Sequence, residues 1–266
     1  AFVSGSNISD LGGSDYLVIK ATSVGTKEAA MKWTNITKTS DSYNIQMWNS
    51  PIEDFNDGDI VICLNASNHR LVSKDGSFKV VFNRANFPSD FVPNTLNDEF
   101  LIYGVNTNSL LRMPFNRVDY YIDKSAVLPP RCAKNTGIFT RAIISHSDGS
   151  KTEQMPIMDC VADMQVIFML DSDGDGIIDR YTDLLKDISG VDLDAEQIRE
   201  QLKEVRVYLL SHEGQKDSGY KYPNSNITVG EFGAGRTFNL STSGITDWEN
   251  YRWKIYRIAA QPNNLG

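Results

Sequence analysis

Alternation of apolar and polar positions dominates this chain and predicts a protein built mainly of β-strands. The segments at 15–24, 43–48 and 118–123 alternate in this way, and 161–170 (VADMQVIFML) is a longer apolar run. Successive side chains of a strand point to opposite faces, so alternation is typical of a strand with one buried face. Turn signals such as KDG at 74–76 separate neighbouring segments and predict hairpins.

One segment has the period of a helix instead. Asp194 is a suitable N-cap, and Gln197 follows three residues later, as in a capping box. Ile198, Leu202 and Val205 then recur at helical spacing. We therefore expect one amphipathic helix over about 194–205.

These patterns together predict an α+β, strand-rich fold with antiparallel sheets. Gly, Ser, Asn and Thr are common over about 211–250, which predicts a long surface loop there. A length of 266 residues suits one large β-rich domain, and the sequence contains no linker that would divide it. We expect a single globular domain over 1–266, with apolar residues, at 41%, sufficient for a real core.

The net charge of the chain indicates which classes of partner it can bind. The formal net charge is −8, and most of it falls within 171–204. A nucleic-acid-binding protein normally carries a basic surface, so we expect no nucleic-acid partner. The sequence also contains no apolar run of the roughly 18 residues that a bilayer-spanning helix needs.

The acidic segment itself matches a calcium-binding pattern. Residues 171–179 read DSDGDGIID, which follows the first nine positions of an EF-hand-type loop. Alternate residues of a tight loop converge on one point, and Ca²⁺ prefers six to eight oxygen ligands. The pattern departs at its twelfth position, which is Thr182, and a strand leads into the loop. The alternative is an acidic, solvated turn. The predicted ligands of a structural Ca²⁺ are Asp171, Asp173, Asp175, Asp179, Asp183 and the backbone carbonyl of Ile177.

Three cysteines suggest one disulfide and one free thiol. Cys132 and Cys160 flank a predicted hairpin, and a bridge between them would stabilise the fold by about 3–4 kcal/mol in the chain-entropy model. Cys63 lies in an apolar strand and is expected to be a buried free thiol. The alternative is three reduced thiols in a cytosolic protein.

The sequence contains no recognisable catalytic constellation. His69, His146 and His212 are far apart in the chain, and none lies in a metalloprotease or nucleophile motif. The glycine-rich stretch 230–235 neither follows a clear strand nor opens a helix, so it is not a phosphate-binding loop. We therefore expect a protein that is not an enzyme.

Four segments, taken together, resemble one family. They resemble, in the same order along the chain, segments of the PilW-type minor pilins of bacterial type IV pili, which are related to the J minor pseudopilin of type II secretion. The four segments are GSDYLVIKATSVGTKEAAMKW at 13–33, MDCVADMQVIFMLDSDGDGIIDRY at 158–181, LKEVRVYLL at 202–210 and YRWKIYRIAAQPNNL at 251–265.

The resemblance implies a pilin-like headgroup and a subunit of a filament. Such proteins act in pilus assembly and priming by packing against other pilin subunits. They reside in the periplasm and inner membrane before assembly and on the cell surface afterwards. The family also tends to pair cysteines at the positions of Cys132 and Cys160, as expected in an oxidising periplasm.

One departure from the family is large, because the long hydrophobic N-terminal helix is absent from this chain. The resemblance implies that this helix was either removed or belongs to a separate short polypeptide. This chain would contact the inner membrane only through that helix. The competing class is a secreted, calcium-stabilised adhesin or carbohydrate-binding module.

Overall fold

The computed structural model describes residues 2–5, 13–96, 98–107 and 110–262. The chain folds into two compact units. The large unit comprises residues 1–19, 119–142 and 154–266, and the small unit comprises 20–118 and 143–153. The prediction of one domain over 1–266 stays a prediction.

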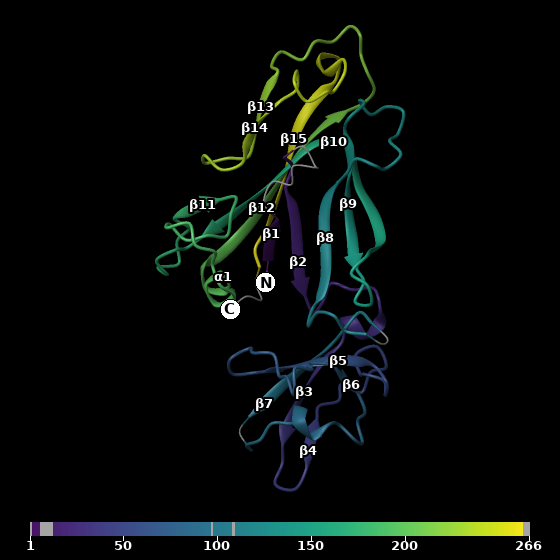
Figure 1. Cartoon of the computed structure of the whole chain (residues 1–266), viewed down its shortest axis with the longest axis vertical. Helices are drawn as coiled ribbons and strands as arrows, with labels where there is room; N and C mark the ends of the chain where they lie inside the picture. Colours follow the sequence, from purple (N-terminus) through teal and green to yellow (C-terminus); the bar gives the residue numbers. More distant parts are fainter. Residues whose placement is uncertain (1, 6–12, 97, 108–109, 263–266) are drawn as a thin grey trace. The chain divides into compact units, whose positions relative to one another are not determined.

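An eight-stranded sheet forms the framework of the large unit (Figure 1). The strands follow the order β1-β2-β8-β9-β10-β12-β15, and β11 also pairs with β10. The strands are β1 (Phe2–Gly5), β2 (Tyr16–Ala21), β8 (Asn116–Asp123), β9 (Gly137–Ile144), β10 (Lys151–Leu170), β11 (Arg180–Thr182), β12 (Leu202–Glu213) and β15 (Arg252–Ala260).

The second half of β10 is buried on both faces. Every residue from 160 to 170 is buried, and successive side chains contribute to two different apolar clusters. Phe168 and Leu170 belong to the cluster that also contains Leu202 and Val205 of β12. Ile167 belongs to the other cluster, on the opposite face. This double burial explains why the segment reads as a continuous apolar run.

The segment 211–250 is not the surface loop that its composition predicts. Its first residues complete β12, and it then forms a hairpin of β13 (Asn226–Val229) and β14 (Arg236–Asn239), followed by the 3₁₀ turn η4 (Trp248–Asn250). Val229 and Leu240 are fully buried in the second cluster. A few widely spaced apolar residues therefore dock the hairpin, although polar residues dominate its sequence.

The predicted helix is much shorter than expected, and the α+β assignment is wrong. α1 spans Ala195–Gln201 and is the one α-helix of the described residues, so the fold is mostly β. The capping box is present: Asp194 accepts from the backbone of Gln197, whose side chain accepts from the backbone of Asp194. The helix ends because Leu202 pairs with Leu170 and starts β12. No helix in the described part of the chain has the length and apolarity to cross a membrane.

The small unit contains a five-stranded antiparallel sheet in the order β4-β3-β7-β5-β6. Apolar clusters cover both faces of this sheet, and Cys63 of β5 lies fully buried in one of them as a free thiol whose pKa burial raises to about 12. Two 3₁₀ turns, η2 (Glu28–Met31) and η3 (Ser89–Phe91), flank the sheet. The strands are β3 (Trp33–Lys38), β4 (Tyr43–Ile45), β5 (Ile60–Asn65), β6 (Val80–Val81) and β7 (Glu99–Gly104).

Gly104 provides a direct test of this packing. A Cβ atom at Gly104 would lie 1.6 Å from the backbone oxygen of Ala29, so η2 can lie against β7 only where the side chain is absent. We expect Gly104→Ala to lower the free energy of unfolding by about 1–3 kcal/mol, as overpacking does. Urea unfolding measures the change. Gly219→Ala is the control, because its Cβ would meet only a side-chain oxygen at 3.4 Å. Equal stability of the two variants would contradict this packing.

Candidate functional site

The acidic segment 171–179 is a turn between two strands. β10 ends at Leu170, and β11 pairs back onto it with Arg180 opposite Leu170. The backbone of Asp179 donates to the carbonyl of Leu170 at 3.0 Å and closes the turn. No helix enters it, so the loop departs from a helix–loop–helix calcium site, as the sequence indicates.

Three of the predicted ligands converge in this turn. Asp171, Asp173 and Asp175 each offer a carboxylate oxygen, and these oxygens all lie within 4.8 Å of one another. Asp171 is buried and the other two are exposed. The donor set of clustered carboxylates fits a hard cation such as Ca²⁺.

Asp171 is fixed by two backbone hydrogen bonds and one ion pair. Its carboxylate accepts backbone hydrogen bonds from Gly174 at 2.8 Å and Gly176 at 2.9 Å, and Lys203 Nζ lies 3.3 Å away. Desolvation is the largest single influence and raises its pKa, but these bonds and Lys203 together hold the pKa below its usual range. The carboxylate is therefore ionised at neutral pH.

The remaining predicted ligands lie outside this three-carboxylate group. Asp179 accepts hydrogen bonds from the backbone and hydroxyl of Ser172 at 3.0 and 2.7 Å. The backbone N–H of Ile177 donates to Asp175 at 2.8 Å, and its side chain is exposed. Asp183 follows β11 and acts electrostatically on Asp15. The participation of these three residues in a metal site stays a prediction.

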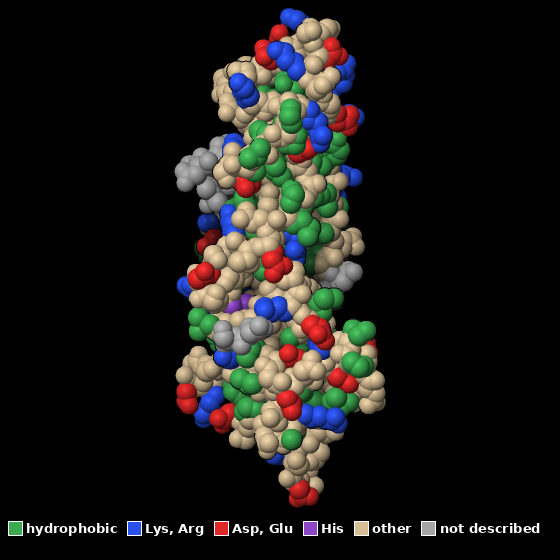
Figure 2. All heavy atoms as spheres, turned by 90° about the vertical axis from the view of Figure 1, so that its right-hand side faces the viewer, with side chains coloured by type: hydrophobic (Ala, Val, Ile, Leu, Met, Phe, Trp, Pro, Cys, Tyr) green, Lys and Arg blue, Asp and Glu red, His purple; other side chains and the backbone are tan. Residues whose placement is uncertain are grey.

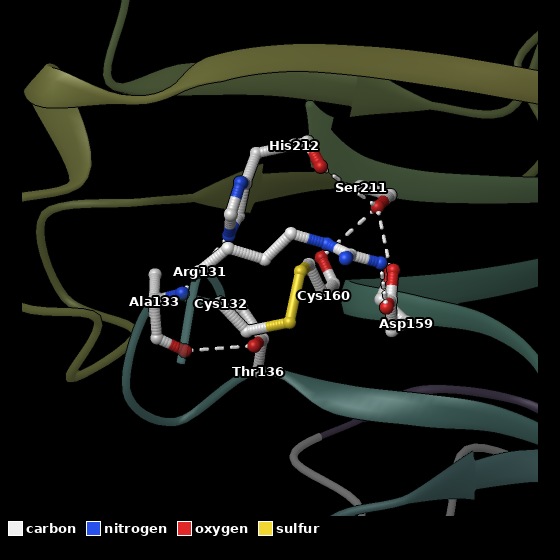
Figure 3. Close-up of a disulfide and its surroundings, with 8 residues drawn as sticks. All are labelled: Arg131, Cys132, Ala133, Thr136, Asp159, Cys160, Ser211 and His212. Atoms are coloured by element: carbon white, nitrogen blue, oxygen red, sulfur yellow. Dashed lines mark hydrogen bonds and ion pairs between the residues drawn. A yellow bond between two sulfur atoms is a disulfide. The ribbon is translucent and has the colours of Figure 1, made fainter. Parts of the chain in front are cut away.

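The structure joins Cys132 and Cys160 in the disulfide that the sequence predicts, with 4.8 Å between their Cα atoms (Figure 3). Both cysteines are buried. The bridge ties the segment that leads into β9 to the buried half of β10. It closes 28 residues of chain, for which the chain-entropy model gives about 3–4 kcal/mol.

The polar residues around the disulfide contact the protein backbone, although the buried Nδ1 of His212 has no hydrogen-bond partner among the described residues. His212 Nε2 accepts from the backbone of Ala133 at 2.9 Å, so the proton of the neutral ring is on Nδ1. Burial lowers the pKa of His212, and its ring packs against Tyr251 with 4.3 Å between centroids. Ser211 donates to the carbonyl of Cys160 at 3.0 Å, as Figure 3 shows. These contacts explain the residues as packing and tethering groups.

A buried polar cluster in the large unit is absent from the sequence predictions. Asp163 is fully buried and accepts from Arg236 of β14, at Nε with 3.0 Å and at Nη2 with 2.5 Å. Ser14 also donates to Asp163, at 2.7 Å. The ion pair fastens the β13–β14 hairpin to β10. The available signal was Asp163 and Gln165 alternating with apolar residues inside the run 161–170.

Asp15 belongs to the same region and is also buried. Its backbone N–H donates to Met164 at 2.8 Å, and its carboxylate accepts from the backbone of Val166 at 2.7 Å. Burial raises the pKa of Asp15 to about 7; the Val166 bond and Arg236 act in the opposite direction, while Asp163 and Asp183 raise it further. The pKa of Asp163 is also raised by burial, despite Arg236.

Comparison with known proteins adds no relative. No protein-family model, no curated protein and no solved structure matches this chain.

Asp15 predicts how stability varies with pH. The folded protein keeps a proton on Asp15 up to about pH 7, whereas the unfolded chain releases it near 3.8. The free energy of unfolding should therefore fall as pH rises from about 4 to 7, by up to about 1.4 kcal/mol per unit from this group. Asp15→Asn keeps an acceptor for Val166 and removes the ionisation.

Denaturant unfolding of both proteins between pH 4 and 8 measures this effect. Asp163 adds a slope of the same sign, and the buried His146 and His212, whose pKa values burial lowers, add the opposite sign below about pH 6.5. The difference between the two curves isolates Asp15. Parallel curves would refute its assignment.

Proposed function

We propose that this chain is a structural subunit of a type IV pilus or related filament, similar to a minor pilin, that acts in assembly by packing against other subunits and not as an enzyme. One observation carries the proposal: segments that resemble the family, although scattered in sequence, are neighbours in one sheet. They supply β10, β12 and β15, which pair in this order.

The strand register gives the residues that lie opposite one another in this layer. Val166 of β10 lies opposite Val207 of β12, which lies opposite Ile258 of β15. The N-terminal segment joins the same layer, because Asp15 is hydrogen-bonded to β10 on both its backbone and its side chain. The start of the first segment and the other three segments therefore belong to one connected layer, whereas residues 20–33 of the first segment belong to the small unit.

The exposed side chains of this layer favour packing against protein. Ile255 and Ile258 of β15 are 41% and 47% exposed, and Met155 and Ile157 of β10 are 56% and 49% exposed. We take these exposed apolar groups as candidate contacts for neighbouring subunits. On the face drawn in Figure 2, hydrophobic side chains lie among interspersed acidic and basic ones, and no large basic surface suits a polyanion.

The disulfide supports the cellular setting of the proposal. Such bonds persist in oxidising compartments, which include the bacterial periplasm and the cell surface. The proposed route is from the periplasm and inner membrane to the extracellular pilus. Its partners are other pilin subunits, and a hydrophobic pilin helix, whether from the same polypeptide or a separate one, provides the membrane contact.

We also propose that the acidic turn binds a structural Ca²⁺ through Asp171, Asp173 and Asp175. The spacing predicts Asp179, Asp183 and the carbonyl of Ile177 as further ligands. A bound cation neutralises carboxylates that otherwise repel one another and fixes the turn that follows β10. It therefore stabilises the large unit and performs no chemistry.

Removal of calcium tests this site. A ligand that binds only the folded state stabilises it by about 2.7 kcal/mol at 100 times its dissociation constant. We expect EDTA to lower the melting temperature by several degrees and Ca²⁺ to restore it. The double variant Asp173→Asn/Asp175→Asn should lose this response, and Asp192→Asn, an exposed acid outside the turn, should keep it. A wild-type melting temperature insensitive to Ca²⁺ would exclude the site.

The filament role requires a test in the source bacterium. Deletion of the gene should remove most surface filaments, as counted by electron microscopy, and the wild-type gene should restore them. Ile255→Asp/Ile258→Asp should restore fewer, because it places charges on the outer strand of the sheet. Val127→Asp is the matched control, since Val127 is 94% exposed outside the strands.

Two results would count against the filament role. Normal filaments in the deletion strain would exclude a part in assembly. Recovery of the protein only as a free secreted species, never with sheared filaments, would favour the competing class of secreted adhesin or carbohydrate-binding module.

A further inference from the structure

Two tryptophans form an exposed aromatic pair in the small unit. Trp33 is 46% exposed and Trp48 is 37% exposed, and their ring centroids lie 5.0 Å apart with 55° between the planes. Tryptophan buries more apolar area than any other side chain and is enriched at binding surfaces. A pair that remains exposed in a folded unit therefore indicates a ligand.

The alternation of β3 places one of these rings. Thr34 and Ile36 point into the core and are buried, so Trp33 and Asn35 lie on the opposite face of the strand. Trp33 pairs across the sheet with Tyr103 of β7. Tyr103 packs against the apolar cluster that covers the β5 side of this face. Trp33 extends that apolar surface into solvent.

The loop after β4 holds the second ring in place. Trp48 Nε1 donates to the backbone carbonyl of Trp33 at 2.8 Å, which uses the only polar atom of the indole. The backbone N–H groups of Trp48 and Ser50 both donate to the carboxylate of Asp54, at 2.8 and 3.1 Å. One hydrogen bond thus holds the ring, two more hold the backbone of its loop, and the ring presents an apolar surface.

A buried lysine forms hydrogen bonds with the backbone of the same loop. Lys32 is 3% exposed, and its Nζ donates to the carbonyls of Pro51 at 3.2 Å and Asp54 at 2.7 Å. It also pairs with Glu28 at 2.7 Å. Burying an ammonium group costs free energy unless hydrogen bonds and an ion pair compensate for the lost water. The buried ammonium group of Lys32 therefore holds the loop in position through its hydrogen bonds. The aromatic pair is preorganised and is not a chance exposure.

Polar groups flank the pair on the same face. Asn35, two residues from Trp33, donates to the carboxylate of Glu99 of β7. Both side chains are only half-buried. The site therefore combines an apolar ring surface with an amide and a carboxylate, which form hydrogen bonds with hydroxyl groups.

This combination selects the chemistry of the ligand. The carboxylate of Glu99 lies on the same face as Trp33, and Glu28 is neutralised by its ion pair with Lys32, so the described neighbours of the rings offer no excess positive charge for phosphate-bearing polymers or anionic lipid surfaces. A pyranose ring offers an apolar C–H face for stacking and a rim of hydroxyls for the amide and carboxylate. We propose that Trp33 and Trp48 form a platform that binds a neutral oligosaccharide, with Asn35 and Glu99 contacting its hydroxyls.

The proposal is independent of filament assembly and is tested on the purified full chain. Cellohexaose, chitohexaose and maltohexaose are the probes, and calorimetry with tryptophan fluorescence is the measurement. We expect saturable binding of at least one hexasaccharide. Trp33→Ala and Trp48→Ala should each raise its dissociation constant at least about tenfold, as loss of a binding hot spot does.

Two further variants separate stacking from folding. Trp48→Phe keeps a ring but loses the bond to Trp33, so it should weaken binding less than Trp48→Ala. Phe232→Ala removes an exposed aromatic of the large unit and should leave the dissociation constant unchanged. Thermal melting checks that every variant is folded.

Three outcomes would overturn the proposal. The first is that none of the three hexasaccharides binds the wild-type protein. The second is that binding is unchanged in both alanine variants. The third is that sedimentation velocity shows a wild-type dimer that these variants dissociate without any effect on sugar binding, which would assign the tryptophan pair to a protein interface.

Discussion

The backbone pairing of β10 with β12 is the constraint on which the large unit depends. From residue 160 to 170, β10 has apolar clusters on both faces, so water cannot reach its backbone. Every buried N–H and C=O then needs a partner within the protein. The ladder with β12 supplies many of these partners, from Val161 opposite Ser211 to Leu170 opposite Leu202. That ladder also ends α1, because Leu202 cannot be helical and paired at once.

The same constraint governs the polar residues that β10 carries. Asp163 lies inside a sheet that excludes water, and an unpaired carboxylate there would cost several kcal/mol. Arg236 compensates it and thereby brings the β13–β14 hairpin onto the sheet. Asp15 shares this environment, and burial raises its pKa to about 7 although Arg236 acts in the opposite direction. One buried strand thus explains both a docked hairpin and a raised pKa.

Features set by local sequence could be predicted, and features set by distant contacts could not. The capping box of Asp194 and the convergence of Asp171, Asp173 and Asp175 depend on residues a few positions apart. The end of α1 at Gln201 depends on pairing with Leu170, thirty-odd positions earlier, and its apolar spacing concealed this. The hairpin within 211–250 was missed because Arg236 and a few apolar side chains dock it, and composition does not reveal such contacts. Trp33 and Trp48 likewise meet only once β3 and the loop after β4 are folded together.

The described residues present exposed apolar side chains of two kinds, one kind in each unit. In the large unit, exposed apolar side chains lie along strands, where a second protein can form many equivalent contacts; area and shape determine such packing more than any single residue does. In the small unit, the aromatic pair is confined to one loop and one strand, and Lys32 and Asp54 fix it. A preorganised site of this size loses little entropy on binding and suits a small, rigid ring. A filament headgroup that presents such a site would combine assembly through one unit with recognition through the other.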